Sequence, residues 1–330
     1  MAMKAAFYTQ VGAAHEVLKL GEIAEPQAGA GEVRVRVAYS GVNPSDVKTR
    51  GGVRSKTLPF ARIIPHSDGS GLIDQVGAGV SAQRLGERVW IWNAAWGRAD
   101  GTAAEYVALP AAQAVPLPAD TSLAAGACLG IPALTAFHAV TMDGGVRGKC
   151  VLIAGGAGAV GHYAIQMAKA EGAAQVIASV SSAPKQALAE AAGADATFNY
   201  RVADALEVAR QLSQGGGFDR IIEVDVAANI ASDLALLHPE GDVVAYGSGA
   251  ANVLVPFFPA ILRNVRLRFF IVYNLNATDR ALELSGLTRL LQAGRLKHNI
   301  DCELPLAAIA DAHERIEQGR ALGNIILKVS

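Results

Sequence analysis

The chain has 330 residues, of which 51% are hydrophobic and 18% charged, and its 29 basic and 30 acidic residues give a formal net charge of −1. This length predicts two domains, the apolar content excludes a disordered chain, and the balanced charge gives no electrostatic reason to expect nucleic-acid binding. Cys128, Cys150 and Cys302 are widely spaced and form neither a disulfide framework nor a C-x-x-C metal pair, which favours a reducing compartment. Because no apolar signal core follows Met1 and no apolar run is long enough to span a bilayer, we expect a cytoplasmic protein without a membrane partner.

The first part of the chain alternates apolar and polar residues in the manner of antiparallel strands. Residues 32–42 place Val33, Val35 and Val37 on one face, with arginines between them. Glycine, asparagine and aspartate separate further predicted strands at residues 71–80, 87–92 and 103–109. Strands at this spacing predict a barrel-like β domain.

The pattern changes near residue 122 to strands that alternate with helices. A helix-like stretch at 123–140 is interrupted near Gly130 and Pro132. Predicted strands follow at 150–155, 175–180, 219–224 and 242–247, and helical stretches follow the first three of them. This alternation predicts an α/β fold with a doubly wound parallel sheet. From about residue 263 the chain has mixed character and ends in a strand, after helices near 279–293 and 305–318.

A glycine motif, G-A-G-A-V-G at residues 156–161, stands directly between a predicted strand and a predicted helix. In a dinucleotide site, the first glycine (Gly156) permits the tight turn, the second (Gly158) lets the backbone approach a pyrophosphate, and the third (Gly161) lets helix and strand pack closely. The motif alone fits a purely structural turn equally well. Its place in a strand–helix alternation favours a dinucleotide site, which would also include Ala157, Ala159 and Val160.

The stretch after the second strand of this predicted sheet indicates which dinucleotide binds. An NAD site usually carries Asp or Glu there to hold the ribose hydroxyls, but no carboxylate lies between Val176 and Lys185. Ser179, Ser181, Ser182 and Lys185 stand there instead, and hydroxyls beside a cation suit the 2′-phosphate of NADPH. The structural alternative is a helix cap at Ser182 with a solvated lysine, and the two interpretations are compatible.

The chain resembles the zinc-independent, zeta-crystallin-like quinone oxidoreductases of the medium-chain dehydrogenase/reductase superfamily. The resemblance covers nearly the whole chain, and two of its segments, GVNP and GIPALTA, point to the quinone reductase branch. It rests on SGVNPSD (40–46), GSGLIDQVGAGV (69–80), GERVW (86–90), GTAAEYVALP (101–110), GIPALTAFHA (130–139), AGGAGAVG (154–161), FNY (198–200), FDRIIEV (218–224) and DLALLHPEGDVVAYGS (233–248).

The resemblance implies a GroES-like β-barrel substrate domain formed by residues 1–122 and 263–330, a Rossmann NADP-binding domain formed by residues 123–262, and a cleft that joins them. It also implies a homodimer and a preference for NADPH. In relatives, the residues that match Lys185 and Tyr200 hold the 2′-phosphate, and the residue that matches Thr135 lies near the nicotinamide. The further positions that would flank the cofactor are Gly247, Ser248, Gly249, Val272 and Asn274.

The zinc ligands of the metal-dependent branch are largely replaced. Val42 stands where that branch has a cysteine, Ser67 follows His66 in place of the usual acid, and Ile131 occupies the third position. A catalytic zinc needs about three protein ligands, so we expect no metal. A hydrogen-bonded, buried role explains His66 more simply than a role as a lone ligand.

Four residues of the segment 43–54 are candidates for contact with the substrate. Asn43 faces the substrate in relatives, and Lys48 and Arg54 stand where relatives often carry pocket tyrosines. The two cations suit a carbonyl oxygen or an anionic substrate, and a solvated basic loop is the structural alternative. Asp46 suits the orientation of Asn43 or of a substrate hydroxyl, and it equally suits a turn after Pro44.

The absence of zinc ligands narrows the expected chemistry. Reduction of an isolated ketone puts charge on one oxygen, which is costly without a Lewis acid, whereas a quinone or an enone spreads that charge over a conjugated system. The expected function is therefore NADPH-dependent, metal-free reduction of quinones by hydride transfer in the interdomain cleft. Two alternatives stay open: an alkenal or enone double-bond reductase, and an NADPH-binding structural or RNA-binding protein with incidental activity, for which the near-neutral charge gives little support.

Overall fold

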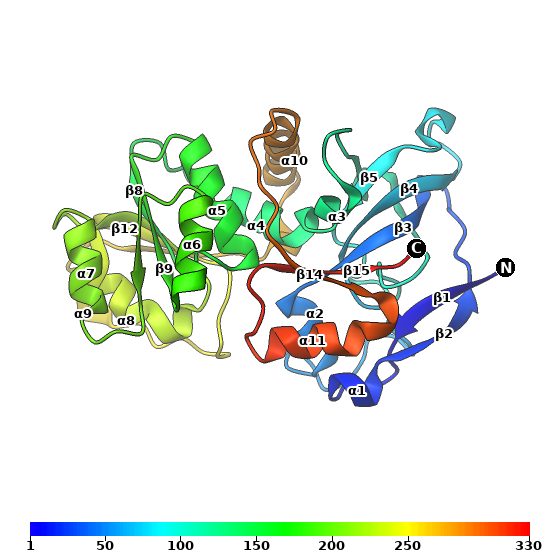
Figure 1. Ribbon diagram of the computed structural model, residues 1–330, viewed down its shortest axis with the longest axis horizontal. Coiled ribbons are helices and arrows are strands. Elements are labelled where there is room, and N and C mark those ends of the chain that lie inside the picture. The colour runs from blue at the N-terminus through cyan, green and yellow to red at the C-terminus, as the bar shows by residue number, and fades with distance from the viewer. The chain divides into compact units, whose positions relative to one another are not determined.

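The computed structural model describes residues 1–330, and contacts within the chain divide it into two units (Figure 1). The first unit comprises Met1–Ile131 and His298–Ser330, and the second comprises Pro132–Lys297. The sequence predicts the boundaries at 122/123 and 262/263, whereas the structure places residues 123–131 in the first unit and residues 263–297 in the second. No helix is both long and apolar enough to cross a membrane.

A mostly antiparallel sheet of seven strands forms the centre of the first unit. Its strand order is β14-β15-β3-β4-β5-β7, and β6 pairs with β3. Only β14 and β15 run parallel to each other, and β1 and β2 form a separate antiparallel pair. The strands are β1 (Ala2–Phe7), β2 (Lys19–Ala24), β3 (Glu32–Val42), β4 (Asp68–Val76), β5 (Arg88–Ile91), β6 (Tyr106–Pro110), β7 (Ala114–Pro116), β14 (Ile300–Pro305) and β15 (Asn324–Lys328). The helices are α1 (Ala14–Val17), α2 (Pro44–Arg50), α3 (Leu123–Gly126) and α11 (Ile309–Glu317).

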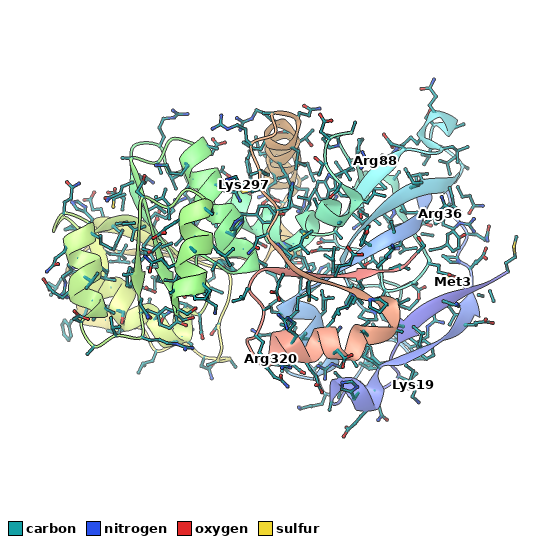
Figure 2. The ribbon with its side chains drawn as sticks, in the orientation of Figure 1. Met3, Lys19, Arg36, Arg88, Lys297 and Arg320 are labelled. Carbon is teal, nitrogen blue, oxygen red and sulfur yellow. The ribbon has the colours of Figure 1, made fainter.

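The alternation predicted for residues 32–42 is confirmed by β3. Val33, Val35 and Val37 are fully buried, while Arg36 points its side chain to solvent on the other face. Figure 2 shows the side chains and labels Arg88 of β5, whose guanidinium donates to the carbonyl oxygens of Pro118, Ala119 and Thr121. These hydrogen bonds hold the segment between β7 and α3 against β5.

A parallel sheet of six strands forms the centre of the second unit. Its order is β10-β9-β8-β11-β12-β13, which confirms the predicted doubly wound arrangement, with α5 against β8 and β9 and α8 against β11 and β12. The strands are β8 (Cys150–Ile153), β9 (Gln175–Val180), β10 (Ala196–Asn199), β11 (Phe218–Glu223), β12 (Leu237–Ala245) and β13 (Arg266–Phe269). The helices are α4 (Leu134–Thr141), α5 (Ala159–Ala170), α6 (Ala183–Ala191), α7 (Ala205–Leu212), α8 (Val226–Leu236), α9 (Phe257–Ile261), α10 (Ala277–Gln292) and the short 3₁₀ helix η4 (Val272–Asn274).

Two contacts explain why the segment 263–297 belongs to the second unit. Strand β13 continues the parallel sheet beyond β12, with Arg266 opposite Asp242. Helix α10 packs on α4 so closely that a Cβ built on Gly286 would meet the ring of Phe137 at 2.1 Å. At the other boundary, a π-helical turn at Leu129–Ala133 interrupts the helical stretch between α3 and α4, as the glycine and proline there predict.

Candidate active site

The turn between β8 and α5 has the geometry of a dinucleotide-binding loop. The amide of Gly156 donates to the carbonyl of Ser179 on β9 at 3.0 Å, and Gly158 occupies the N-cap position of α5. Gly155 has a left-handed backbone, with φ at 66°. Gly156, the first glycine of the motif, does not. Gly156 lies within the turn that the Gly158 amide closes on the Gly155 carbonyl at 2.9 Å. It is also needed for close packing, because its Cβ would lie 2.6 Å from the Cβ of Ala178.

The other two glycines of the motif differ in how much room surrounds them. A Cβ on Gly161 would lie 2.3 Å from the carbonyl oxygen of Gly155, so helix α5 can approach the loop only without a side chain there. Gly158 is exposed, and its Cβ would meet only that same oxygen, at 3.3 Å. Ala157 is buried beneath the loop, while Ala159 and Val160 begin α5 and bear its first unpaired N–H groups, which suit an anion.

The carboxyl ends of β9 and β10 meet beside the start of α6. Val180 pairs with Asn199, and the Tyr200 amide donates to the Val180 carbonyl at 3.0 Å, so Ser181 and Tyr200 follow neighbouring strands at the same edge. Lys185 lies in the first turn of α6, and the phenol ring of Tyr200 is exposed. Three of the residues predicted for a 2′-phosphate, Ser181, Lys185 and Tyr200, thus follow β9 and β10 at one edge of the sheet.

The hydrogen bonding of Ser179 and Ser182, at the same edge, differs from what the sequence predicts. The Ser179 hydroxyl accepts a hydrogen bond of 3.2 Å from the Gly155 amide, so it supports the glycine loop. Ser182 occupies the N-cap position of α6, but its side chain makes no cap hydrogen bond, although Pro184 does lie in the first turn. Arg201, which the sequence analysis did not single out, places its guanidinium 5.9 Å from the centre of the Tyr200 ring and adds a second cation.

The residues predicted to flank a nicotinamide lie on α4, after β12 and on η4. Thr135 is buried in the first turn of α4, and Val272 is buried in η4, which Asn274 ends. In the loop after β12, Gly247 lies so close to Val224 that a Cβ would meet the Val224 carbonyl at 2.2 Å. The Ser248 hydroxyl donates to the carbonyl of Ala250 at 2.7 Å.

A carboxylate outside the predicted set holds this loop after β12. Asp225 follows β11, and its Oδ1 accepts a hydrogen bond of 2.7 Å from the Gly249 amide. The Asp225 amide in turn donates to Glu223 at the end of β11. The loop thus has a fixed attachment to the neighbouring strand end, which no local sequence pattern indicates.

In the first unit, Asn43 lies between two buried carboxyl groups. Its backbone amide donates to Oδ2 of Asp46 at 2.8 Å, and the two residues form a capping box at the start of α2. Its side-chain amide donates to Oδ2 of Asp68 at 2.8 Å, and the Ile131 amide donates to the same oxygen at 3.0 Å. Asp46 therefore contacts Asn43, as its first predicted role expects, and it does so within helix α2 and not in a turn after Pro44. No signal in the sequence indicates Asp68.

Burial changes the protonation of both carboxyl groups. Removal from water raises the pKa of Asp46 to about 7, against the opposing hydrogen bond from the Asn43 amide and the charge of Arg54. Burial, with the nearby Asp46, also raises the pKa of Asp68 well above its ordinary value. Oδ1 of Asp68 is buried and has no hydrogen-bond partner.

The two predicted cations of this segment lie in different surroundings. Lys48 is half-buried in the last turn of α2, whereas Arg54 is exposed in the segment that follows the helix. Arg54 lies close enough to Asp46 to act on its charge. The segment is therefore basic and partly solvated, as the structural alternative expects, and Lys48 is its less exposed member.

The side chains of the chain do not fit a catalytic zinc ion. No group of three or more His, Cys, Asp or Glu side chains could hold a metal ion. His66 is fully buried and uses both ring nitrogens: Nδ1 lies 2.8 Å from the Ser40 hydroxyl and Nε2 lies 2.9 Å from Nε2 of His313. Burial lowers the pKa of His66 to about 3. Cys128 is also buried, and its thiol lies against the Ala124 carbonyl.

Comparison with known proteins agrees with this architecture. The family described as alcohol dehydrogenase GroES-like domain matches residues 29–119, and the family described as zinc-binding dehydrogenase matches residues 159–286. The quinone oxidoreductase of Homo sapiens is 30% identical over 315 residues, 94% of each chain. That of Mus musculus is 32% identical over 325 residues, also 94% of each chain.

Solved structures share the whole fold. A protein described as an NAD-dependent alcohol dehydrogenase has a TM-score of 0.91 at 30% identity, covering 99% of this chain and 100% of its own. A quinone oxidoreductase of Pseudomonas syringae has a TM-score of 0.87 at 27% identity with the same coverage. A mycobacterial protein solved with NADPH has a TM-score of 0.87 at 26% identity, again with 99% and 100% coverage.

A GroES-like domain and a Rossmann domain with a glycine-rich loop together define a nicotinamide-dependent oxidoreductase. Within this class, the extent of the match over both domains decides the family. The chain belongs to the quinone oxidoreductase family of the medium-chain dehydrogenase/reductase superfamily.

Proposed function

We propose that this protein reduces quinones with NADPH by hydride transfer and without a metal ion. The observation that carries the proposal is the polar group at the carboxyl ends of β9 and β10. Ser181, Lys185 and Tyr200 gather there, with Arg201 beside Tyr200 and no carboxylate at the end of β9. A phosphate suits these hydroxyls and cations, whereas the ribose hydroxyls of NADH call for an acid.

The names of related structures do not decide the cofactor. One is described as NAD-dependent, and another was solved with NADPH. The residues of this chain support NADPH, since Lys185 and Arg201 offer two positive charges to a doubly charged phosphate.

The metal-free part of the proposal rests on the donor set. The family description that matches the second unit mentions zinc, but His66 makes its hydrogen bonds within the first unit and Val42 and Ile131 have no ligating side chain. A conjugated acceptor suits such a protein, because its oxygens share the incoming charge and hydrogen bonds suffice to stabilise it.

Different residues of the chain would bind the cofactor and contact the substrate. NADPH supplies the hydride when it is bound. The glycine loop and the start of α5 would hold its pyrophosphate, and Thr135, Val272 and Asn274 would orient its nicotinamide, with Gly247 and Ser248 beside it. One hydrogen of the Asn43 amide binds Asp68, which leaves the other for a substrate oxygen. A proton from water then completes the hydroquinone.

We also infer that the protein is a homodimer. Six of its sixteen exposed large apolar side chains lie between residues 254 and 269, and β13 in this segment is an edge strand with one free side. The six are Leu254, Phe257, Phe258, Ile261, Leu262 and Phe269. A second copy of the same edge would cover them. Light scattering after gel filtration should give a dimer, and Phe258→Glu should give a monomer while Leu85→Glu, in the first unit, should not.

The experiment that tests the catalytic proposal is NADPH oxidation at 340 nm by protein treated with a chelator. The acceptors are 9,10-phenanthrenequinone, 1,4-benzoquinone and 2-cyclohexenone, with NADH assayed in parallel. Quinone turnover that prefers NADPH and ignores the chelator is the expected result. Turnover of the enone alone would contradict the quinone assignment and identify a double-bond reductase, and loss of activity with the chelator would contradict metal-free chemistry.

A further inference from the structure

A buried chain of ionisable side chains joins three elements of the second unit. Arg280 and Glu283 lie one turn apart on α10, with Arg280 Nη1 3.1 Å from Oε2 of Glu283. The other carboxylate oxygen, Oε1, lies 3.0 Å from Nδ1 of His138 on α4, the helix on which α10 packs (Figure 1). At the opposite end, Arg280 Nη2 donates to the carbonyl oxygen of Val272 on η4.

The burial of this chain makes its arrangement rigid. Arg280, Glu283 and His138 are all less than a tenth exposed. The ring of Phe270, which follows β13, covers His138 with a centroid separation of 4.7 Å. Buried ionisable groups need partners, and Arg280 has them at both ends, in Glu283 and in the Val272 carbonyl, which holds its guanidinium in place. The carbonyl of Val272 is therefore held from α10.

The hydrogen bond from Arg280 occupies the Val272 carbonyl and leaves the Val272 amide available to a ligand. While the carbonyl accepts from Arg280, the Val272 amide donates to no group of the protein. Such an unused donor at a buried residue calls for a ligand or a water molecule. On α4, Thr135 precedes His138 by three residues and so lies on the same side of the helix. The chain of Arg280, Glu283 and His138 thus connects to both positions that flank the predicted nicotinamide.

We propose that Arg280 and Glu283 are positioning residues for the nicotinamide ring: they hold the Val272 carbonyl from α10 and so direct the Val272 amide to the carboxamide of the cofactor. The inference rests on the proposed function, because it takes the nicotinamide to lie at Thr135 and Val272. It assigns the two residues an effect on the reacting half of the cofactor and none on the adenine half. Neither residue touches the reacting atoms.

The test compares the binding of NADPH, which contains both halves of the cofactor, with that of 2′,5′-ADP, which contains only the adenine half. Glu283→Gln keeps the shape of the side chain and weakens its hold on Arg280, and Arg280→Lys keeps the charge but loses the forked geometry. For both variants we expect kcat with 9,10-phenanthrenequinone to fall about tenfold and the affinity for NADPH to fall about threefold or more. The affinity for 2′,5′-ADP, which lacks the nicotinamide, should stay within about twofold of the unmodified protein.

Kinetic isotope effects and a matched control variant distinguish an effect on the position of the nicotinamide from a general loss of structure. With 4-deuterated NADPH, the isotope effect on kcat should rise in both variants, since hydride transfer becomes slower relative to product release. The control is Arg263→Lys, because Arg263 also donates to two main-chain carbonyls of the second unit, those of Leu234 and Leu237. It should leave kcat, both affinities and the isotope effect unchanged.

Two results would overturn the inference. One is unchanged kcat and NADPH affinity in both variants, and the other is an equal loss of affinity for NADPH and 2′,5′-ADP. If Glu283→Gln unfolds in a thermal melt, Arg280→Lys decides alone, since it keeps a cation beside Glu283. Failure of the proposed function is distinct, because the unmodified protein would then bind neither NADPH nor 2′,5′-ADP.

Discussion

The side-chain amide of Asn43 donates a hydrogen bond of 2.8 Å to the carboxyl group of Asp68, a residue 25 positions further along the chain. The same oxygen accepts from the backbone amide of Ile131, so one carboxyl group holds both the start of α2 and the π-helical turn before α4. Asp68 is fully buried, and its position fixes the residue that we assign to the substrate.

Removal of this carboxyl group should destabilise the protein. Asp68→Ala leaves two buried donors, Asn43 Nδ2 and the Ile131 amide, without an acceptor, at about 1–3 kcal/mol each. We expect the free energy of unfolding in urea to fall by about 2–6 kcal/mol. Asp68→Asn should be milder, because burial already favours the neutral form and an amide oxygen can accept both bonds. Equal losses in the two variants would contradict this account.

Acid should weaken the fold through His66. Burial lowers its pKa to about 3, so below pH 6.5 the unfolded chain binds a proton that the folded ring does not. The stability that this histidine contributes is therefore present above pH 6.5 and lost as the pH falls. His66→Asn suits the test, since asparagine tolerates the left-handed backbone there, with φ at 77°. The stability advantage of the unmodified protein should be about 2–3 kcal/mol larger at pH 6.5 than at pH 4.5.

Asp46 should give the opposite sign and so serves as the comparison. Its pKa is raised to about 7, so the folded protein binds the extra proton between about pH 4 and 7. The stability advantage over Asp46→Asn should be largest at the acidic end and decline as the pH rises towards 7. Urea unfolding midpoints of the unmodified protein, His66→Asn and Asp46→Asn, measured across this pH range, test both predictions. A stability difference between the unmodified protein and either variant that does not change with pH would contradict the prediction for that residue.

The fold could be predicted where local patterns carry it. Valine alternation identified β3, and the change from strands to strand–helix pairs identified the parallel sheet, because burial on one face or two leaves a period in the sequence. Strand β10 was not predicted, since its four residues, Ala196–Asn199, are too short for a period. The boundary at 262/263 differs from the structure because β13 joins the sheet by pairing with β12, which no local pattern reveals.

The same reason limited the prediction of the site. The glycine motif, Lys185 and Tyr200 are local signals at strand ends, and the structure brings them to the carboxyl edge of the sheet. Asp68 and the Arg280–Glu283 pair act through residues distant in sequence, so nothing near them marks their role. The sequence motif assigns the tight turn to Gly156, and only the three-dimensional structure shows that the preceding Gly155 has the left-handed backbone.

The glycine loop provides a prediction that separates folding from binding. Gly161→Ala places a Cβ 2.3 Å from a backbone oxygen of the loop, so α5 or the loop must move, and both stability and NADPH binding should be lost. At Gly158 a Cβ fits with a small adjustment, and we expect Gly158→Val to keep the melting temperature but to block NADPH and NADH alike. Calorimetry and fluorescence titration measure the two effects, and retained binding in Gly158→Val would contradict the pyrophosphate assignment.

The cofactor preference should depend on Lys185. Its loss in Lys185→Ala removes a charge-assisted bond to the 2′-phosphate, worth about 1.5–3 kcal/mol, so the NADPH affinity should fall about 10- to 100-fold. NADH has no such phosphate, and its affinity should change less than about twofold. Lys169→Ala is the control, since Lys169 belongs to the same unit but pairs with Asp195 at 2.7 Å and should affect neither cofactor. Equal weakening of both cofactors by Lys185→Ala would instead mean that the lysine supports the shape of the β9–α6 turn, and the preference would then have to rest on Arg201 and Tyr200.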